Sequence, residues 1–395
     1  MTMEIFLDKR NSQNFSGFHP WVLDRSVIEP TSRPSAGQIV DLVHANGSWI
    51  GRGVYNPHSR IRIRLYQWRK ESSLDHNWLC EQLSQAVAMR KRWMERHGKL
   101  DAVRWVNSEG DGLSGLIVDQ FGDFITIHLT AMAMLAWESA IVQWFAENLA
   151  PQGIFLKVDQ NTATAEGIEA KELVAFGVQP TEPVVVSDGP VKILVDLGVG
   201  QKTGYYLDQR NNRQRAARWM GSGRVLDVCC YLGGFSLAAH AIAKPSSITA
   251  VDTSAKVLEQ AQRNAELNGA EIDFVQADCF EFLGSLTDSK EQFETVILDP
   301  PKMASNRSQI QSALRAYHRL NLSAVNLLEP GGMLITCSCS GRISRDDFRG
   351  MLASVAQRAR RSIQIVESLG ADFDHPIVAH CPETEYLKCF ICRVI

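Results

Sequence analysis

The stretch GRVLDVCCYLGGF, residues 223–235, decides the fold of the C-terminal half. Its apolar run RVLDV has the length of a buried strand, and two glycines follow where the chain must turn. Downstream, strand-like runs alternate with helix-like segments, which predicts a doubly wound parallel sheet whose ligands lie beyond the carboxyl ends of the strands. The strand-like runs are 247–252, 272–278, 295–300 and 332–339, and the helix-like segments lie near 235–243, 254–268, 308–328 and 345–360.

Four successive strands of this predicted sheet end in aspartate: Asp227, Asp252, Asp278 and Asp299. A single aspartate at such a place commonly caps the next helix. Four of them beside a Gly-Gly turn indicate a binding site instead, in which Asp252 can accept hydrogen bonds from ribose hydroxyls and Asp278 from an adenine amino group. The turn lacks the G-x-G-x-x-G spacing of dinucleotide-binding proteins.

This set of features resembles the class I S-adenosylmethionine-dependent methyltransferases. The resemblance implies that S-adenosylmethionine is the cofactor and that Asp299 faces the target base. It implies that Asp227 and the glycine turn line the methionine side. The residues expected to bind the cofactor are Asp227, Tyr231, Gly233, Gly234, Phe235, Asp252, Asp278, Cys279, Arg210 and Pro300. For Arg210, pairing with RNA phosphate and a salt-bridged surface helix are the alternatives.

The sequence LDPPK, residues 298–302, resembles the motif with which nucleic-acid methyltransferases hold a flipped base. Its two prolines stiffen the backbone and remove two N–H donors. An aromatic residue usually follows them in enzymes that methylate exocyclic amino groups, whereas Lys302 stands here. This difference favours methylation of a ring carbon.

Two cysteines lie in LITCSCSG, residues 334–341, and could serve as metal ligands, a disulfide, a nucleophile or apolar filler. A relaxed disulfide cannot join cysteines two apart in a strand. Zinc would need two further ligands, for which Cys381 with His380 is the nearest pair, and we expect no metal. We predict that Cys337 fills the core and that Cys339, nearer the mouth of the sheet, is a nucleophile that adds to C6 of cytosine.

The motifs together resemble the PUA-domain 23S ribosomal RNA cytosine-C5 methyltransferases. They are TGYYLDQRNNR at 203–213, DVCCYLGGF, LDPPK, CSCSG and ETEYLKCF, with HPWV at 19–22 and GRGVYNPHSRIRIR at 51–64 in the N-terminal part. The resemblance implies a small PUA-like β-barrel at 1–72, a middle α/β domain at 73–190 and a Rossmann-like methyltransferase domain at 191–395. It also implies formation of 5-methylcytosine in 23S rRNA through a covalent bond between Cys339 and C6, with Asp299 holding the base.

The charge is unevenly distributed. Residues 1–100 carry 15 Lys plus Arg against 9 Asp plus Glu, a net charge of +6, so a whole-chain charge of -3 leaves -9 for the rest. A basic module on an acidic protein suits a polyanionic partner, although a solvated basic face is the plain alternative. We predict RNA contacts from Arg60, Arg62 and Arg64 in the first domain and from Lys302, with Trp21, Tyr55 and Trp68 as stacking surfaces.

Composition and hydropathy indicate a cytoplasmic protein without a membrane segment, since no apolar run reaches the roughly 18 residues that a span requires. The expected partner is 23S rRNA, naked or in a partly assembled large subunit, and a homodimer is a further state considered. Two other functions stay open at this point. One is guanine methylation at N7 or N2, which needs no thiol, and the other is a non-catalytic ribosome assembly factor that binds RNA.

Overall fold

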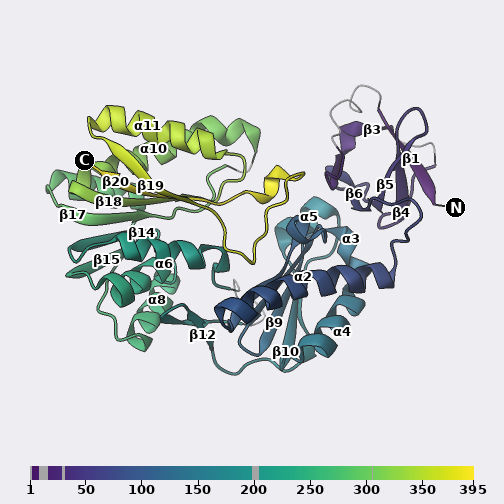
Figure 1. Cartoon of the computed structure of the whole chain (residues 1–395), viewed down its shortest axis with the longest axis horizontal. Helices are drawn as coiled ribbons and strands as arrows, with labels where there is room; N and C mark the ends of the chain where they lie inside the picture. The colour runs from purple at the N-terminus through teal and green to yellow at the C-terminus, as the bar shows by residue number, and fades with distance from the viewer. Residues whose placement is uncertain (1, 9–16, 29–31, 198–203, 305) are drawn as a thin grey trace. The chain divides into compact units, whose positions relative to one another are not determined.

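The computed structural model describes residues 2–8, 17–28, 32–197, 204–304 and 306–395 (Figure 1). The chain forms two compact units. The first comprises Met1–Val184, Asp196–Gly204 and Phe373–Thr384, and the second comprises Val185–Val195, Tyr205–Asp372 and Glu385–Ile395. The predicted boundary at residue 190 therefore falls inside a hairpin of the second unit, formed by β12 (Val184–Asp188) and β13 (Val191–Val195).

The first unit begins with a sheet in the order β2-β6-β5-β4-β1-β3. Its core is the set of side chains that alternate inward along these strands, among them Val40, Tyr55 and Ile63. The small β module predicted from the N-terminal sequence is thus present. The strands are β1 (Met3–Leu7), β2 (Trp21–Leu23), β3 (Val27–Ile28), β4 (Ile39–Val43), β5 (Trp49–Tyr55) and β6 (Ile61–Gln67).

A second sheet of the first unit has the order β11-β10-β9-β8-β7 and packs against helices. The longest helix, α2 (His76–His97), begins where the Asp75 side chain accepts a hydrogen bond from the backbone of Trp78. The strands are β7 (Ala102–Asn107), β8 (Leu116–Phe121), β9 (Phe124–Leu129), β10 (Gly153–Val158) and β11 (Lys171–Gly177). The other helices are α3 (Met132–Leu135), α4 (Glu138–Leu149) and α5 (Gln160–Glu166).

The second unit is built on a sheet in the order β16-β15-β14-β17-β18-β20-β19. Its first five strands are parallel, which confirms the doubly wound sheet, whereas β20 runs antiparallel to both β18 and β19. The strands are β14 (Arg224–Val228), β15 (Ser247–Asp252), β16 (Asp273–Gln276), β17 (Phe293–Leu298), β18 (Leu328–Ser338), β19 (Ile363–Leu369) and β20 (Lys388–Val394).

Helices cover both faces of this sheet. Figure 1 shows α10 (Ile310–Leu327) and α11 (Arg345–Ala359) on one side, and α6 (Arg210–Trp219) and α8 (Ala255–Leu267) on the other. Successive residues of β17 accordingly face different cores, since Val296 packs with α10 and Ile297 with α6. Short helices α7 (Gly234–Ala238) and α9 (Cys279–Asp288) follow β14 and β16.

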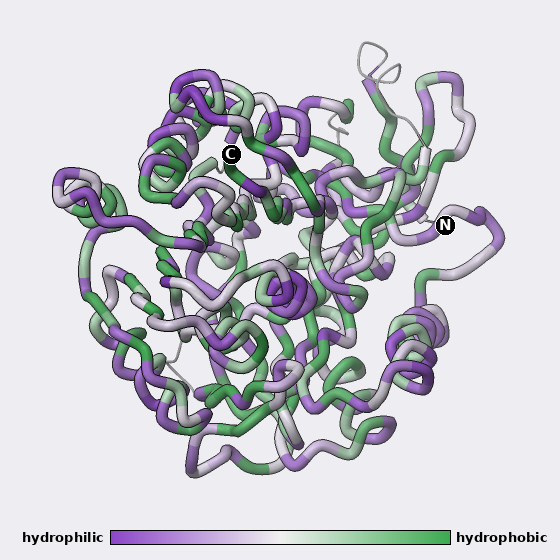
Figure 2. The backbone as a smooth tube through the Cα atoms, turned by 60° about the vertical axis from the view of Figure 1, so that its left-hand side comes forward, coloured by the Kyte–Doolittle hydropathy of each residue, from purple (hydrophilic) through white to green (hydrophobic). Residues whose placement is uncertain are grey.

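Hydrophobic and hydrophilic stretches alternate along the backbone (Figure 2). Within the described residues, none of the helices has the length and apolar character needed to cross a membrane.

Candidate active site

The carboxyl ends of the parallel strands bring the predicted residues to one edge of the sheet. Asp252 is the last residue of β15, Asp299 directly follows β17, and Cys339 directly follows β18. Asp227 lies one residue before the end of β14. The edge therefore carries a row of carboxylates and the Cys339 thiol.

Asp227 lies beneath this edge, and the structure corrects its predicted contact with the cofactor. Its side chain is fully buried, and Oδ2 accepts hydrogen bonds from the backbone N of Ser236 at 3.1 Å and from its Oγ at 2.7 Å. Burial raises the pKa of Asp227 to about 6. Asp227 thus fixes the start of α7, which positions the turn rather than contacting a ligand.

In the turn after β14, Gly233 has the backbone conformation expected of a tight turn, whereas Gly234 and Phe235 lie in surroundings that the sequence did not predict. Gly233 has φ +79°, a conformation that favours glycine. Gly234 is small for a packing reason, because a Cβ there would lie 2.5 Å from the Tyr205 hydroxyl and 2.9 Å from Cδ of Arg213. The side chain of Phe235 belongs to the buried core on the α6 side, so only its backbone is left for the predicted role in cofactor binding.

Cys229 and Tyr231 also adopt left-handed backbone conformations, with φ 63° and 50°. Non-glycine residues rarely do so, and such strain concentrates at functional sites. The Tyr231 backbone N–H donates to Oδ2 of Asp252 at 3.1 Å, which ties the turn to the end of β15. The Tyr231 ring packs against exposed Tyr206, with centroids 5.0 Å apart.

The ends of β15 and β16 offer the acceptors that a nucleoside requires. Asp252 is half-buried, and its oxygens accept from the backbone of Tyr231 and Ser254, so each retains a further lone pair. Asp278 is exposed and caps α9 through Oδ1, which accepts from Phe280 N at 2.8 Å. These carboxylates fit the ribose and adenine of S-adenosylmethionine, whose hydroxyl and amino groups are donors.

Cys279, another predicted cofactor residue, is half-buried at the first position of α9. The Cys229 thiol donates a hydrogen bond to its sulfur, which lowers the pKa of Cys279 and raises that of Cys229. The two thiols thus bridge the ends of β14 and β16, a contact that no sequence pattern indicates.

Asp299 occupies the middle of the edge. Gln209 donates from Nε2 to its Oδ1 at 3.1 Å. Burial, together with the charges of Asp208 and Asp227, raises the pKa of Asp299 to about 7. The group is therefore about half protonated at neutral pH and can donate as well as accept hydrogen bonds.

Cys339 and Cys337 lie in different surroundings. Cys337 is fully buried in the core on the α6 side and is paired in register with Cys389 of β20, as expected of core filler. Cys339 is half-buried, and its Sγ lies 4.0 Å from the carbonyl oxygen of Pro300, the residue after Asp299. Burial and the charges of Asp299 and Asp208 raise the pKa of the Cys339 thiol to about 11.

Ser340 joins the two loops that carry Asp299 and Cys339. Its buried hydroxyl accepts from the backbone N of Met303 at 3.0 Å and of Ala304 at 3.2 Å, and it lies 3.2 Å from the Tyr317 hydroxyl. In the same loop, Pro300 is buried and Lys302 is exposed. The serine of CSCSG thus fixes the Asp-Pro-Pro loop, a role that the sequence prediction missed.

The motif ETEYLKCF also contributes to this edge. The Tyr386 hydroxyl donates to Oδ2 of Asp208 at 2.7 Å, and Lys388 Nζ donates at 2.8 Å both to Ser340 O and to Tyr386 O. None of Asp208, Tyr386 and Lys388 was predicted as a site residue. In the sequence they are marked only by their place in the motifs TGYYLDQRNNR and ETEYLKCF, to which no catalytic or binding role was assigned.

Arg210 is buried in an ion pair, with Nη1 3.0 Å from Oδ2 of Asp372. Its neighbour Arg213 donates from Nε to Oδ2 of Asp188 at 2.6 Å, and Tyr205 donates to the same oxygen. These contacts favour the salt-bridged alternative over the predicted pairing of Arg210 with the cofactor or with phosphate.

In the first unit, the structure corrects one of the three arginines predicted to contact RNA. Arg64 is 8 % exposed and forms ion pairs with Glu109 at 3.3 Å and Glu166 at 3.2 Å. Arg62 is half-buried, and its Nη1 donates to the carbonyl oxygens of Asn56 and Pro57. Arg60 is exposed.

The three aromatic residues beside these arginines are placed differently. Tyr55 is fully buried, so it is core rather than a stacking surface. Trp68 is half-buried against the same core, and Trp21 donates from Nε1 to Oε1 of Glu109 at 2.8 Å.

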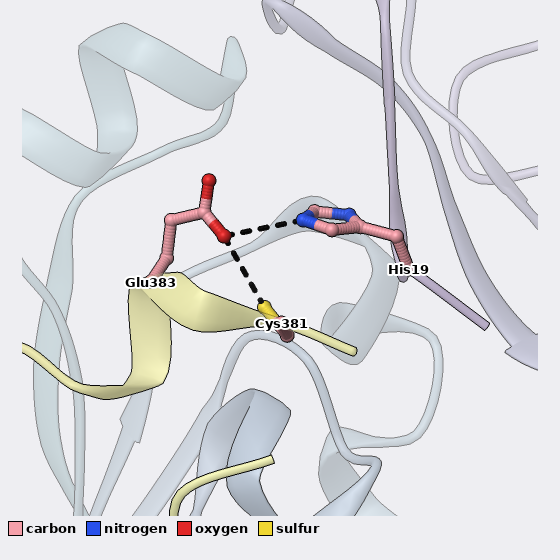
Figure 3. Close-up of side chains that lie close together, drawn as sticks. All are labelled: His19, Cys381 and Glu383. Atoms are coloured by element: carbon pink, nitrogen blue, oxygen red, sulfur yellow. Dashed lines mark hydrogen bonds and ion pairs between the residues drawn. The ribbon is translucent and has the colours of Figure 1, made fainter. Parts of the chain in front are cut away.

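Cys381, one of the two residues considered for zinc, lies with His19 and Glu383 (Figure 3). Oε2 of Glu383 lies 3.2 Å from His19 Nε2 and 3.8 Å from Cys381 Sγ. His19 Nδ1 accepts a hydrogen bond from the Trp21 backbone N–H at 3.1 Å, so the ring proton is on Nε2. That nitrogen then has no lone pair for a metal, and the group is a hydrogen-bonded cluster around the Glu383 carboxylate.

Two family models match the chain. A PUA-like domain matches residues 5–68, and an S-adenosylmethionine-dependent methyltransferase matches residues 166–390. The overall fold also resembles a SAM-dependent methyltransferase from Streptococcus mutans, with a TM-score of 0.83 at 18% identity over 99% of this chain and 100% of the other. A methyltransferase crystallised with SAH gives a TM-score of 0.85, also at 18% identity and the same coverage.

The chain is therefore an S-adenosylmethionine-dependent methyltransferase with an N-terminal PUA-like domain. Among its relatives, the ribosomal RNA large subunit methyltransferase I of Erwinia tasmaniensis is 34% identical over 100% of both chains. The protein of the same name from Klebsiella pneumoniae is 35% identical over 99% of this chain and 98% of its own. The chain belongs to the family of these ribosomal RNA large subunit methyltransferases.

Proposed function

We propose that this methyltransferase forms 5-methylcytosine in 23S rRNA through a covalent bond between Cys339 and C6 of the base. The name of the relatives supports a large-subunit rRNA substrate. One observation carries the choice of cytosine C5: a half-buried thiol lies 4.0 Å from the carbonyl oxygen of Pro300 in the Asp-Pro-Pro loop. Guanine methylation would give that thiol no task.

Cys339 supplies what cytosine lacks, because C5 by itself is a poor nucleophile. The thiolate electron pair forms the S–C6 bond, and the C5=C6 π electrons shift toward C4 and N3, which makes C5 enamine-like. After C5 has accepted the methyl group, loss of the C5 proton re-forms the C5=C6 double bond and expels the thiolate. The cysteine thus leaves the cycle unchanged.

Asp299 acts as the general acid when the thiolate adds to C6. Its pKa of about 7 leaves a substantial protonated fraction at neutral pH, in which the carboxylic acid donates to N3 and its carbonyl oxygen accepts from the amino group. A proton at N3 neutralises the charge that develops there when the thiolate adds to C6. Gln209 holds the carboxyl group in place through its hydrogen bond to Oδ1.

Asp252 and Asp278 hold the nucleoside of S-adenosylmethionine, and the turn from Cys229 to Gly234 lies against its methionine part. When bound, this cofactor supplies an electrophilic sulfonium methyl group. Asp227 acts indirectly, since its hydrogen bonds to Ser236 fix the turn.

A covalent trap tests the mechanism. With RNA that carries 5-fluorocytosine at the target, the enzyme should stall as a protein–RNA adduct, because fluorine cannot leave C5 as the proton does. Peptide mapping should place the adduct on Cys339. Cys339→Ala should abolish turnover while cofactor binding persists, and Cys337→Ala is the matched control two residues away. Full activity of Cys339→Ala would refute the mechanism and favour guanine as the substrate, whereas an adduct on Cys337 would refute the assignment of Cys339 as the nucleophile.

A further inference from the structure

Lys388 is a buried cation to which the steps above assign no task. It is 1% exposed, although lysine is almost never buried unless it is paired. Its Nζ donates to the carbonyl oxygens of Ser340 and Tyr386, both at 2.8 Å. No carboxylate in the described part of the chain forms an ion pair with it. A buried ammonium with only neutral partners is costly, and such groups mark functional sites.

The sheet register brings this ammonium next to the predicted nucleophile. Lys388 is the first residue of β20 and is paired with Ser338, the last residue of β18. Cys339 follows Ser338 directly, and the Ser340 carbonyl that Lys388 contacts comes one residue later. Lys388 therefore lies against residues 338–340, of which Cys339 is the middle one.

The charges that face Cys339 show why a cation matters there. Asp299 and Asp208 both raise the pKa of the thiol, in addition to burial. The backbone N–H of Cys339 and the ammonium of Lys388 oppose them and lower the pKa of the thiol. Lys388 is thus the single side chain among these groups that favours the thiolate.

Lys388 itself faces mixed charges. Burial and the charge of Arg345 lower the pKa of Lys388, whereas Cys339, Glu385 and Asp347 raise it, and the net result is a pKa of about 8. The amine is still mostly protonated at neutral pH. It can therefore act as a fixed positive charge rather than as a base.

We propose that Lys388 is the counter-ion of the Cys339 thiolate and holds it in the nucleophilic form against C6. This inference rests on the proposed function, in which Cys339 is the nucleophile. The thiol proton passes to solvent water, the sulfur keeps the electron pair that forms the S–C6 bond, and Lys388 remains an ammonium throughout. Lys388 is a positioning residue, since it acts through Cys339 and the segment that carries it.

Thiol reactivity without RNA tests the inference independently of methyl transfer. Alkylation of Cys339 by iodoacetamide is followed at pH 7 by peptide mass mapping, in wild type and in Lys388→Gln. The glutamine can still donate a hydrogen bond to a carbonyl but carries no charge. At this pH Lys388 is mostly charged, and the alkylation rate follows the small thiolate fraction of Cys339. We expect this rate to fall about tenfold. Lys388→Arg, which keeps the charge, should restore the wild-type rate.

Arg361 provides a matched control on the same two strands. Its guanidinium donates to Leu328 O at 2.6 Å and Glu329 O at 2.9 Å in β18 and to Val394 O at 3.3 Å in β20, at the end away from Cys339. Arg361→Gln should lower the melting temperature without changing the alkylation rate of Cys339. If Lys388→Gln is too unstable to study, Lys388→Met in the same assay takes its place.

The outcomes separate the two proposals. An unchanged alkylation rate in Lys388→Gln and Lys388→Met overturns the role of Lys388, whatever the enzyme methylates. A lowered alkylation rate together with a fully active Cys339→Ala keeps the electrostatic pairing but removes its use in catalysis. A 5-fluorocytosine adduct that forms more slowly in Lys388→Gln and at the wild-type rate in Lys388→Arg supports both.

Discussion

Replacing Asp299 by asparagine should change the pH dependence of methyl transfer more than its maximum rate. The substitution keeps the shape of the side chain and its ability to donate to N3, but it removes the group that titrates at about pH 7. In the proposed mechanism the productive enzyme has Asp299 protonated and Cys339 ionised. The two groups therefore limit the rate on opposite sides of pH 7.

The magnitude follows from the two pKa values, about 7 for Asp299 and about 11 for Cys339. Below pH 7 the wild-type rate should rise about tenfold per pH unit with the thiolate fraction. Between pH 7 and pH 11 the loss of the Asp299 proton cancels that gain, and the rate should level off. The amide never loses its donor, so the variant should keep rising. The ratio of variant to wild-type activity should grow about 50-fold from pH 7 to pH 9.

The assay is kcat/KM for methyl transfer from labelled S-adenosylmethionine to an rRNA transcript, measured from pH 5.5 to pH 9.5. Asp273→Asn is the control, because this exposed carboxylate begins β16 at the opposite end of the sheet. An independent check is thermal unfolding. A raised carboxyl pKa means that native Asp299 binds its proton more tightly than the unfolded chain does, so stability falls as pH rises through 7. The melting temperature of Asp299→Asn relative to wild type should accordingly rise from pH 5 to pH 8. An inflection near pH 7 that persists in Asp299→Asn would refute the assignment.

Further substitutions test the remaining assignments. Asp252→Ala should weaken S-adenosylmethionine binding at least about tenfold in calorimetry and leave RNA affinity unchanged, since it removes the expected acceptor for ribose; equal cofactor affinity would reject the site. Gly234→Ala should cost about 1–3 kcal/mol in urea unfolding, because the new Cβ meets side-chain atoms at 2.5 Å, whereas Gly284→Ala, with no atom within 4 Å in a helix, should be neutral or stabilising. Arg64→Ala should destabilise by about 3–5 kcal/mol, because two carboxylates lose their buried partner. Arg60 is exposed, so Arg60→Ala should not change stability but should reduce the slope of log Kd for RNA against log salt by about 1. An unchanged slope would mean that RNA does not contact Arg60.

The sequence was sufficient for the doubly wound sheet because each parallel strand repeats a local signal, an apolar run that ends at a polar residue before a helix. It was insufficient for β20 (Lys388–Val394), which enters antiparallel between β18 and β19. An apolar run such as KCFICRV predicts a buried strand. It does not predict which strands lie next to it in the sheet, because that depends on how the whole chain is connected. For this reason Lys388 could not be placed beside Cys339.

The errors at the level of side chains have a common physical cause. Strand periodicity assigns Arg62 and Arg64 to one face, but it does not say what covers that face, and Arg64 is covered by Glu109 and Glu166. Phe235 likewise follows a ligand-binding turn in sequence but points into the core. Residues at strand ends were placed well because the parallel sheet itself gathers them at one edge.

The charges around Cys339 link binding of the base to activation of the thiol. With Asp208 and Asp299 ionised, the thiol of Cys339 is held in its neutral form, its pKa raised to about 11. In the proposed mechanism a cytosine accepts a hydrogen bond at N3 only from protonated Asp299, so binding of the base selects the state in which one of the two opposing charges is absent. The ammonium of Lys388 then faces one fewer anion and can favour the thiolate. One proton on Asp299 therefore acts twice, as the donor to N3 and as the neutralised charge beside sulfur, and this explains why the nucleophile would ionise when its target is in place.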